Sequence, residues 1–181
     1  LLLNRAEKRN ALNVAMIDSL KKYFTDLNND DSVKVIILRA KGEAFCAGAD
    51  LEYLQTLQSN TYEENLADSK NLAELFKLIY THNKIIISQV EGAALAGGCG
   101  LATVCDLCYA TPESKFGYTE VKIGFIPAIV SFFLLRKIGE ANTKELLLTG
   151  KIIEAANAVK MGLINEVVDS GKIEEHITQI A

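Results

Sequence analysis

The chain has 181 residues, of which 49% are apolar, and its net charge is −4 at neutral pH. This length fits one domain with a sizeable core, and the acidic balance gives no support for a protein that binds nucleic acid or a membrane surface. No apolar run reaches the roughly 18 to 20 residues that span a bilayer, so we expect a soluble, cytoplasmic protein.

The first half of the chain predicts two helices and two buried strands. Apolar side chains recur at helical spacing over residues 12–27, after Asn10 as a possible cap, and again over residues 62–80. The β-branched runs 33–38 and 84–90 are typical of strands that are covered on both faces.

A loop rich in small residues follows each of these strands. The segment AKGEAFCAGADLEYL carries Gly42 and Gly48 and leads into a helical pattern. In EGAALAGGCGLATVCD, small residues give way to a helix that starts near Gly98, and a short strand follows at 107–110. The order strand, loop, helix recurs about every 50 residues, which predicts a layered α/β fold with crossover connections.

The last third predicts a polar turn after Pro112, the segment FGYTEVKIGFIP, three short helices up to about Lys160, and a last strand in GLINEVV. There is no linker or low-complexity region, so residues 1–181 read as a single domain. Only two histidines accompany the four cysteines, and one C-x-x-C pair is weak evidence for a metal. We therefore expect buried free thiols and a reducing compartment.

Two of the loops could stabilise an anion through their backbone. Ala47 lies in a glycine-containing turn after a strand, where small side chains let a ligand approach main-chain N–H groups. The segment from Ala96 to Gly98 offers a second set of unpaired amides at a helix start. Two such amides could stabilise an enolate-like anion. Each loop by itself is better explained by tight turns and close packing, and GGCG is not the dinucleotide-binding fingerprint.

Three segments together resemble the signature segments of the crotonase (enoyl-CoA hydratase/isomerase) superfamily, in the family's order and spacing: FCAGADL at 45–51, EGAALAGGCGLATVCDLCYA at 91–110 and FGYTEVKIGFIP at 116–127. The N-terminal NRAEKRNAL resembles the family's loop near the coenzyme A phosphates, with Ala6 where a proline is usual. The resemblance implies a crotonase-like ββα spiral (superhelix) over residues 1–181, without the family's N-terminal strand and C-terminal trimerisation helices. It also implies an acyl-CoA thioester substrate from fatty acid metabolism, no cofactor or metal, no nucleic-acid or membrane partner, and a homotrimer or a hexamer of two trimers.

The resemblance assigns roles to individual residues. The peptide N–H groups of Ala47 and Gly97 would form the oxyanion hole, and Glu120 would exchange a proton with Cα. The other substrate-binding positions that it implies are Gly48, Ala49, Asp50, Leu51, Gly98, Gly100, Lys8 and Arg9. Lys8 and Arg9 could pair with the nucleotide phosphates, although a basic pair in a loop is more often solvated.

Five further side chains are interpreted one by one. We expect Asp50 to cap the helix that follows it and to order the Ala47 loop, and Asp106 to accept backbone amides at a helix end. Tyr118 either faces the pocket or packs within a strand. The two histidines have no serine or cysteine motif nearby, so we assign them no role.

Gly100 departs from the family's pattern. Family hydratases carry two glutamates that face the acyl chain, and the first would fall at Gly100. Paired carboxylates divide the activation of water and the protonation of carbon, whereas a solitary Glu120 must do both or only shuttle a proton. Three functions stay open: hydration of the 2,3 double bond, Δ3,Δ2-enoyl-CoA isomerisation, and a non-catalytic acyl-CoA-binding scaffold. Hydration is favoured because Gly100 and EVKIGFIPAIVSFFLLRKIGE resemble the methylglutaconyl-CoA hydratase branch.

Overall fold

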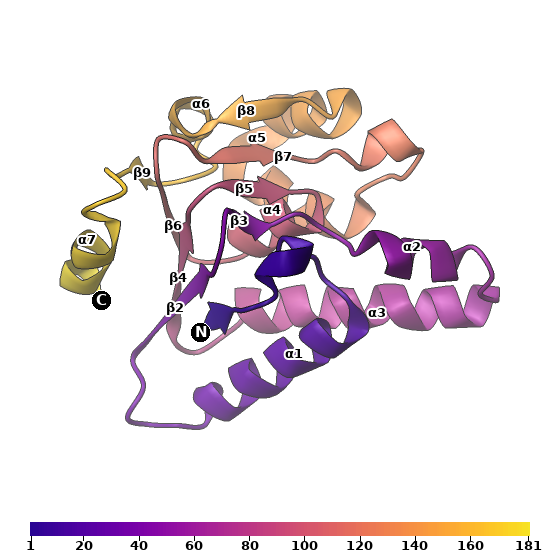
Figure 1. Cartoon of the computed structure of the whole chain (residues 1–181), viewed down its shortest axis with the longest axis horizontal. Coiled ribbons are helices and arrows are strands. Elements are labelled where there is room, and N and C mark those ends of the chain that lie inside the picture. Colours follow the sequence, from indigo (N-terminus) through magenta and orange to yellow (C-terminus); the bar gives the residue numbers. More distant parts are fainter.

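The computed structural model describes residues 1–181, which form two sheets with helices packed around them (Figure 1). The larger sheet is parallel, in the order β1-β2-β4-β6-β9, with strands Leu2–Leu3, Val35–Ala40, Ile85–Val90, Leu107–Ala110 and Glu166–Val167. The smaller sheet has the order β3-β5-β7-β8, with strands Ala44–Cys46, Ala93–Leu95, Lys115–Gly117 and Ile152–Glu154. Its first three strands are parallel to one another, and β8 runs antiparallel to β7.

Four of the helices follow pairs of strands, with one strand of each pair from each sheet. The seven helices α1 to α7 span Val14–Asn28, Leu51–Leu57, Tyr62–Tyr80, Gly97–Thr103, Ala128–Thr149, Ala155–Lys160 and Ile173–Ile180, and short 3-10 helices cover Ala6–Lys8 and Glu120–Ile123. The pair β2 and β3 precedes α2 and α3, β4 and β5 precede α4, and β6 and β7 precede α5. This repeated ββα unit confirms the expected crotonase-like α/β spiral.

The first two predicted helices are present, but the first one has a different cap. Helix α3 has the bounds that were predicted, and Thr61 and Glu64 form a capping box at its start. Helix α1 begins at Val14, and the Asn13 side chain accepts the N–H of Met16 at 3.0 Å. The proposed cap, Asn10, is wrong because its backbone is left-handed, with a φ of 53°, and its side chain is buried elsewhere.

The prediction of three short helices up to about Lys160 is confirmed, since α5 consists of two helical segments and α6 ends at Lys160. Helix α5 runs over Ala128–Thr149 with a break at Gly139, where φ is 75° and ψ is 171°. A strand, β8, then precedes α6, and the sequence pattern did not reveal it because it has only three residues. The last strand falls in GLINEVV as predicted, and an additional helix, α7, follows it.

The core lies between the two sheets and the helices, and it contains all four cysteines as free thiols. Burial raises the pKa of Cys46, Cys99 and Cys105 to about 12 and that of Cys108 to about 11. These thiols therefore stay protonated at neutral pH and contribute as small apolar side chains. None of the helices has both the length and the apolar character needed to cross a membrane.

Asn10 holds the N-terminal loop against the chain that leads into β3. Its Oδ1 accepts the N–H of Arg5 at 2.8 Å, and its Nδ2 donates to the carbonyls of Lys41 and Ala44 at 2.9 and 2.8 Å. The side chain is fully buried. Asparagine also tolerates the left-handed backbone better than most residues do. One side chain thus satisfies three backbone groups, and its bond to the Ala44 carbonyl is buried.

Replacing Asn10 with alanine should lower the free energy of unfolding by about 2 to 4 kcal/mol, because buried amide and carbonyl groups lose their partners. Urea denaturation measures this loss. Asn29→Ala is the matched control, since Asn29 is exposed and its side chain bonds only to the Thr25 carbonyl of the preceding turn. Equal losses in the two variants would show that the Asn10 network does not stabilise the fold.

Candidate active site

The loop after β3 is paired with the N-terminal loop through a single parallel bridge. The N–H of Leu12 donates to the carbonyl of Gly48 at 2.7 Å, and the N–H of Asp50 donates to the carbonyl of Leu12 at 2.9 Å. Since both of these groups face Leu12, the amide of Ala49 between them faces the opposite side. It donates to no other group of the chain. Ala49 therefore presents an unpaired N–H.

The structure corrects the choice of Ala47 as a donor to a ligand. The Ala47 N–H donates to the carbonyl of Arg9 at 3.0 Å, so it is already satisfied within the protein. Sequence reasoning found the right loop and the wrong amide. Which amide of FCAGADL stays unpaired depends on how this loop pairs with residues 9–12, and no local pattern in the sequence shows that pairing.

Helix α4 begins directly after a strained residue. Ala96 has a φ of 50° and a ψ of −127°, a conformation that non-glycine residues rarely adopt, and its N–H donates to the carbonyl of Gly117 at 2.7 Å. The turn at Ala96 starts the helix at Gly97, whose amide belongs to the first turn and has no partner within the helix. Gly97 is thus a second unpaired donor, as the sequence predicted.

Small residues let these two loops touch. A Cβ added to Gly48 would lie 2.8 Å from the Cβ of Ala96 and 3.5 Å from the N of Gly97. A Cβ added to Gly98 would lie 2.2 Å from the carbonyl oxygen of Cys46, which no side chain could tolerate. The glycines at 48 and 98 therefore serve close backbone packing, and this packing brings the Ala49 and Gly97 loops together.

Glu120 follows the third strand of the same sheet. It begins the 3-10 helix after β7, its side chain is half-buried, and its Oε2 has no partner in the protein. Burial raises the pKa of Glu120 above its usual value. A carboxyl group with a raised pKa can take up and release a proton closer to neutral pH than an exposed glutamate.

These three groups share one edge of the sheet. Ala49, Gly97 and Glu120 come two or three residues after the ends of β3, β5 and β7, which are neighbouring parallel strands. Figure 1 shows the three arrows pointing the same way, toward α2 and the loop that carries Glu120. Ligands of α/β proteins commonly bind at the carboxyl ends of parallel strands.

Gly100 is closely packed by two apolar side chains. A Cβ at Gly100 would lie 2.5 Å from Cγ1 of Val130 and 3.0 Å from the ring of Phe76. The residue is buried in α4, and apolar side chains fill the space beside it. Its part in substrate binding therefore stays a prediction, and the packing leaves it no space for a side chain of its own. No side chain larger than hydrogen fits at this position unless Val130 and Phe76 move.

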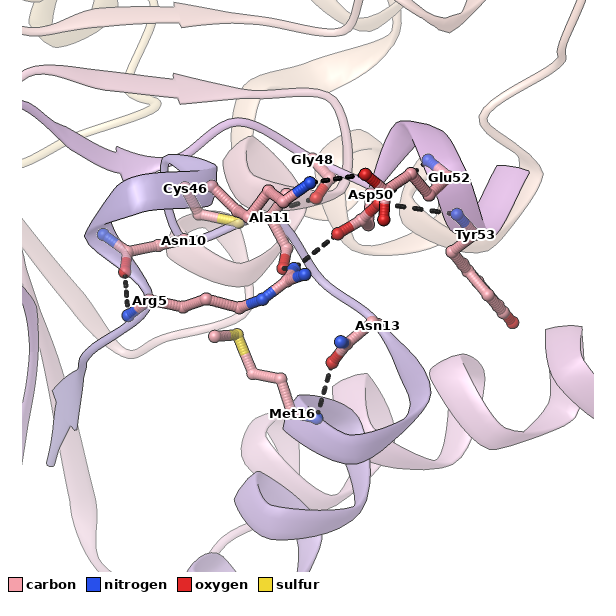
Figure 2. A network of polar contacts seen from close by, with 11 residues as sticks. Arg5, Asn10, Ala11, Asn13, Met16, Cys46, Gly48, Asp50, Glu52 and Tyr53 are labelled. Carbon is pink, nitrogen blue, oxygen red and sulfur yellow. Dashed lines mark hydrogen bonds and ion pairs between the residues drawn. The ribbon is translucent and has the colours of Figure 1, made fainter. Parts of the chain in front are cut away.

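Asp50 caps α2, as predicted, and it also forms an ion pair that the sequence did not reveal. Its Oδ1 accepts the N–H groups of Glu52 and Tyr53 at 2.9 and 3.4 Å, and its Oδ2 lies 2.6 Å from Nη1 of Arg5 (Figure 2). The Arg5 guanidinium lowers the pKa of Asp50 below its usual value. Asp50 is nearly buried, so it orders the loop that carries Ala49.

The outer residues of the predicted site are exposed. Lys8 lies at the end of the first 3-10 helix, and its Nζ is 2.6 Å from Oε1 of Glu52. Arg9 is exposed in a left-handed conformation, and Leu51, the first residue of α2, is 75% exposed. Lys8 and Arg9 both adjoin the loop that carries Ala49. The carbonyl of Arg9 accepts the N–H of Ala47, and Lys8 pairs with Glu52, which follows Asp50 by two residues.

The remaining side chains have structural roles. Tyr118 is fully buried, and its hydroxyl bonds to Thr103, so it packs inside the protein. Asp106 accepts the N–H of Ile86 at the start of β4, so its predicted place at a helix end is wrong. His82 bonds to the carbonyl of Phe24.

Comparison with known proteins agrees with the signature segments. The enoyl-CoA hydratase/isomerase family matches residues 1–181. The protein named "Putative enoyl-CoA hydratase" of Thermus thermophilus is 44% identical, over 99% of this chain and 71% of its own length. Crotonyl-CoA hydratase of Syntrophomonas wolfei is 35% identical, over 100% of this chain and 69% of its own length.

Solved structures show the same fold. An enoyl-CoA hydratase/isomerase (crotonase) structure from Legionella pneumophila superposes with a TM-score of 0.96 at 36% identity, and the match covers 99% of this chain and 70% of that one. The enoyl-CoA hydratase of Mycobacterium smegmatis gives 0.94 at 31% identity, over 99% of this chain and 69% of that one. By sequence, strand order and fold, the chain belongs to the enoyl-CoA hydratase/isomerase family of crotonase-type enzymes.

Proposed function

We propose that the protein is an enoyl-CoA hydratase that adds water across the 2,3 double bond of an acyl-CoA thioester. One observation carries the proposal: two unpaired amides, of Ala49 and Gly97, and the half-buried carboxyl group of Glu120 follow the ends of three neighbouring parallel strands. The names of the relatives agree with it, because the Thermus and Syntrophomonas proteins are both called hydratases.

The two amides would bind the thioester oxygen. When water attacks C3, the electron pair of the double bond moves toward the carbonyl, and negative charge develops on that oxygen. Fixed N–H donors stabilise this charge without having to reorganise, and each is worth roughly 3 to 4 kcal/mol in comparable sites. The close packing at Gly48 holds the two loops in place before the substrate arrives.

Glu120 would handle the proton in both halves of the reaction. Its carboxylate takes a proton from water as the water oxygen bonds to C3, and the carboxylic acid then returns a proton to C2 as the enolate collapses. The sum is the addition of one water molecule. A raised pKa suits both steps, since the group must gain and lose a proton near the working pH.

The apolar filling beside Gly100 favours a second candidate, Δ3,Δ2-enoyl-CoA isomerisation. Val130 and Phe76 leave no room there for another carboxylate, and moving a double bond needs only one. A third candidate, the non-catalytic scaffold, fits less well because a half-buried carboxyl group with an unpartnered oxygen is costly to keep without a use.

Incubation with 2-enoyl-CoA and 3-enoyl-CoA thioesters in H₂¹⁸O distinguishes the three candidate functions. Hydration predicts loss of the conjugated thioester absorbance and ¹⁸O in the product. Turnover confined to moving the double bond from position 3 to 2 would establish the isomerase. Binding of acetoacetyl-CoA without turnover of either thioester would leave the acyl-CoA-binding scaffold.

The finer proposals concern the substrate and the assembly. We propose a substrate of the methylglutaconyl-CoA type, supported by Gly100 and the segment at 120–140 that resembles that branch. Lys8 and Arg9 would pair with the nucleotide phosphates, and the protein would be a cytoplasmic homotrimer or a hexamer of two trimers. Comparing kcat/KM for methylglutaconyl-CoA with that for crotonyl-CoA tests the substrate. Equal or higher efficiency with crotonyl-CoA would contradict it.

The raised pKa of Glu120 gives the pH dependence a definite direction. Glu120 must be deprotonated to accept a proton from water, and burial makes it protonate at a higher pH than an exposed glutamate does. We expect kcat/KM to fall on the acid side with an apparent pKa above the ordinary glutamate value of about 4.3. A profile measured at constant ionic strength checks this, and an acid limb at or below that value would contradict the role.

A further inference from the structure

A buried hydrogen bond joins the strand that leads to Glu120 to the end of helix α4. The Tyr118 hydroxyl lies 2.6 Å from Oγ1 of Thr103, and both side chains are buried. Oγ1 of Thr103 donates its only hydrogen to the carbonyl of Cys99 at 2.8 Å. The hydrogen between Tyr118 and Thr103 therefore comes from Tyr118, and the tyrosine is the donor.

Thr103 is itself held from the other side. It is the last residue of α4. Nζ of Lys137 donates hydrogen bonds to the carbonyls of Thr103 and Cys105, each at 2.9 Å. Lys137 belongs to α5. The carboxyl end of α4 is thus fixed to both α5 and the segment after β7, and it offers Tyr118 a rigid acceptor.

The same segment is tied to the other end of α4. The N–H of Ala96, just before Gly97, donates to the carbonyl of Gly117 at 2.7 Å. Gly117 and Tyr118 are consecutive, so one short stretch of chain bonds to both ends of the helix. Since α4 has seven residues, these two attachments are about 9 to 10 Å apart along the helix axis. Two separated attachments fix the orientation of the Gly117–Tyr118 segment relative to α4, whereas a single attachment would let the segment rotate.

Glu120 has no comparable anchor of its own. Its Oε2 has no partner, and Thr119, at the start of the 3-10 helix, makes no side-chain capping bond. Only Thr119 separates Glu120 from Tyr118. The nearest side chain that fixes the path of the chain before Glu120 is therefore Tyr118.

We propose that Tyr118 is a positioning residue, whose hydrogen bond to Thr103 holds the Glu120 carboxyl group at a set place relative to the Gly97 amide. The role assigned to Glu120 rests on the proposed function. Without the bond, the first turn of the 3-10 helix moves more freely and the carboxyl group reaches water more often. The loss falls on proton transfer, while the backbone donors of the oxyanion hole remain.

Tyr118→Phe removes the hydroxyl group and keeps the ring. We expect kcat with an enoyl-CoA to fall about tenfold, while the dissociation constant and the absorbance shift of a bound aromatic enoyl-CoA, which reports carbonyl polarisation, stay unchanged. We also expect the pKa of Glu120 to fall toward the ordinary glutamate value, measured by ¹³C NMR of the carboxyl signal that Glu120→Gln removes. Thr103→Val should reproduce these effects. Thr103→Ser keeps a hydroxyl group and should have the kcat and the Glu120 pKa of the wild-type protein.

Tyr109→Phe is the matched control. Tyr109 is buried in β6, and its hydroxyl group forms no hydrogen bond that links the site. If Tyr118→Phe has the same kcat and the same Glu120 pKa as Tyr109→Phe, the proposal is overturned. A loss of the absorbance shift together with kcat also overturns it, since the oxyanion hole would then depend on Tyr118.

The titration separates this proposal from the proposed function. A wild-type protein that hydrates no enoyl-CoA refutes the function, yet a lower Glu120 pKa in Tyr118→Phe than in Tyr109→Phe still supports the positioning role. Normal hydration with identical pKa values in the two variants refutes only the positioning role.

Discussion

Glu120→Gln should lower kcat for hydration by about 10² to 10⁴, because the amide can neither accept a proton from water nor return one to carbon. Gln has nearly the shape of Glu, and Oε2 of Glu120 bonds to no protein group, so the fold loses little. The dissociation constant for a non-reacting acyl-CoA should stay within about twofold of the wild-type value. Single-turnover kinetics and equilibrium binding measure the two effects separately.

Glu113→Gln is the control for this substitution. Glu113 is exposed just before β7, and its Oε2 accepts the hydroxyl of Ser170 at 3.1 Å, away from the strand ends that form the site. Its variant should show wild-type kcat and an unchanged acid limb. If Glu120→Gln behaves in the same way, Glu120 takes no part in the chemistry and the proposed mechanism fails.

Gly97→Pro should lower kcat by about 10² to 10³, the usual cost of losing one oxyanion donor. Proline removes the amide hydrogen, and Gly97 is the first residue of α4, where no intrahelical hydrogen bond is lost. Proline also restricts the residue before it to extended conformations, whereas Ala96 has a φ of 50° and a ψ of −127°. Urea denaturation of the variant therefore accompanies the kinetics, to separate the loss of the donor from a loss of stability.

Gly97→Ala separates the amide from the glycine itself. A Cβ at this position meets only Cδ1 of Leu12, at 3.6 Å, which is ordinary van der Waals contact. The alanine variant keeps the N–H and should lose far less activity than the proline variant. The absorbance shift of a bound aromatic enoyl-CoA should shrink in Gly97→Pro alone. Comparable activity in the two variants would remove the Gly97 amide from the oxyanion hole.

The long periodic elements were predictable because their patterns are local. Helix α3 has the bounds that its apolar spacing indicates, and β4 and β6 match the predicted strands 84–90 and 107–110 to within a residue. The strand β8 was not predictable, because three residues are too few to carry a period.

The sequence by itself determined the family and the loops of the site. Three signature segments at fixed spacing identified the chain, and their glycines marked the turns after β3 and β5. Glu120 was also identified as a site residue through these segments, because a single glutamate forms no local pattern that indicates a function. These conclusions rest on residue types and spacing, which the chain carries in any conformation.

Only the tertiary structure decided which atoms are available. Ala47 and Ala49 lie in the same loop, and the contact with Arg9 and Leu12 pairs the amide of Ala47 but not that of Ala49. The space beside Gly100 is closed by Val130 and Phe76, which are 24 or more residues away in sequence. Hydrogen-bond partners and filled volume depend on contacts between distant segments, so local residue patterns could not specify them.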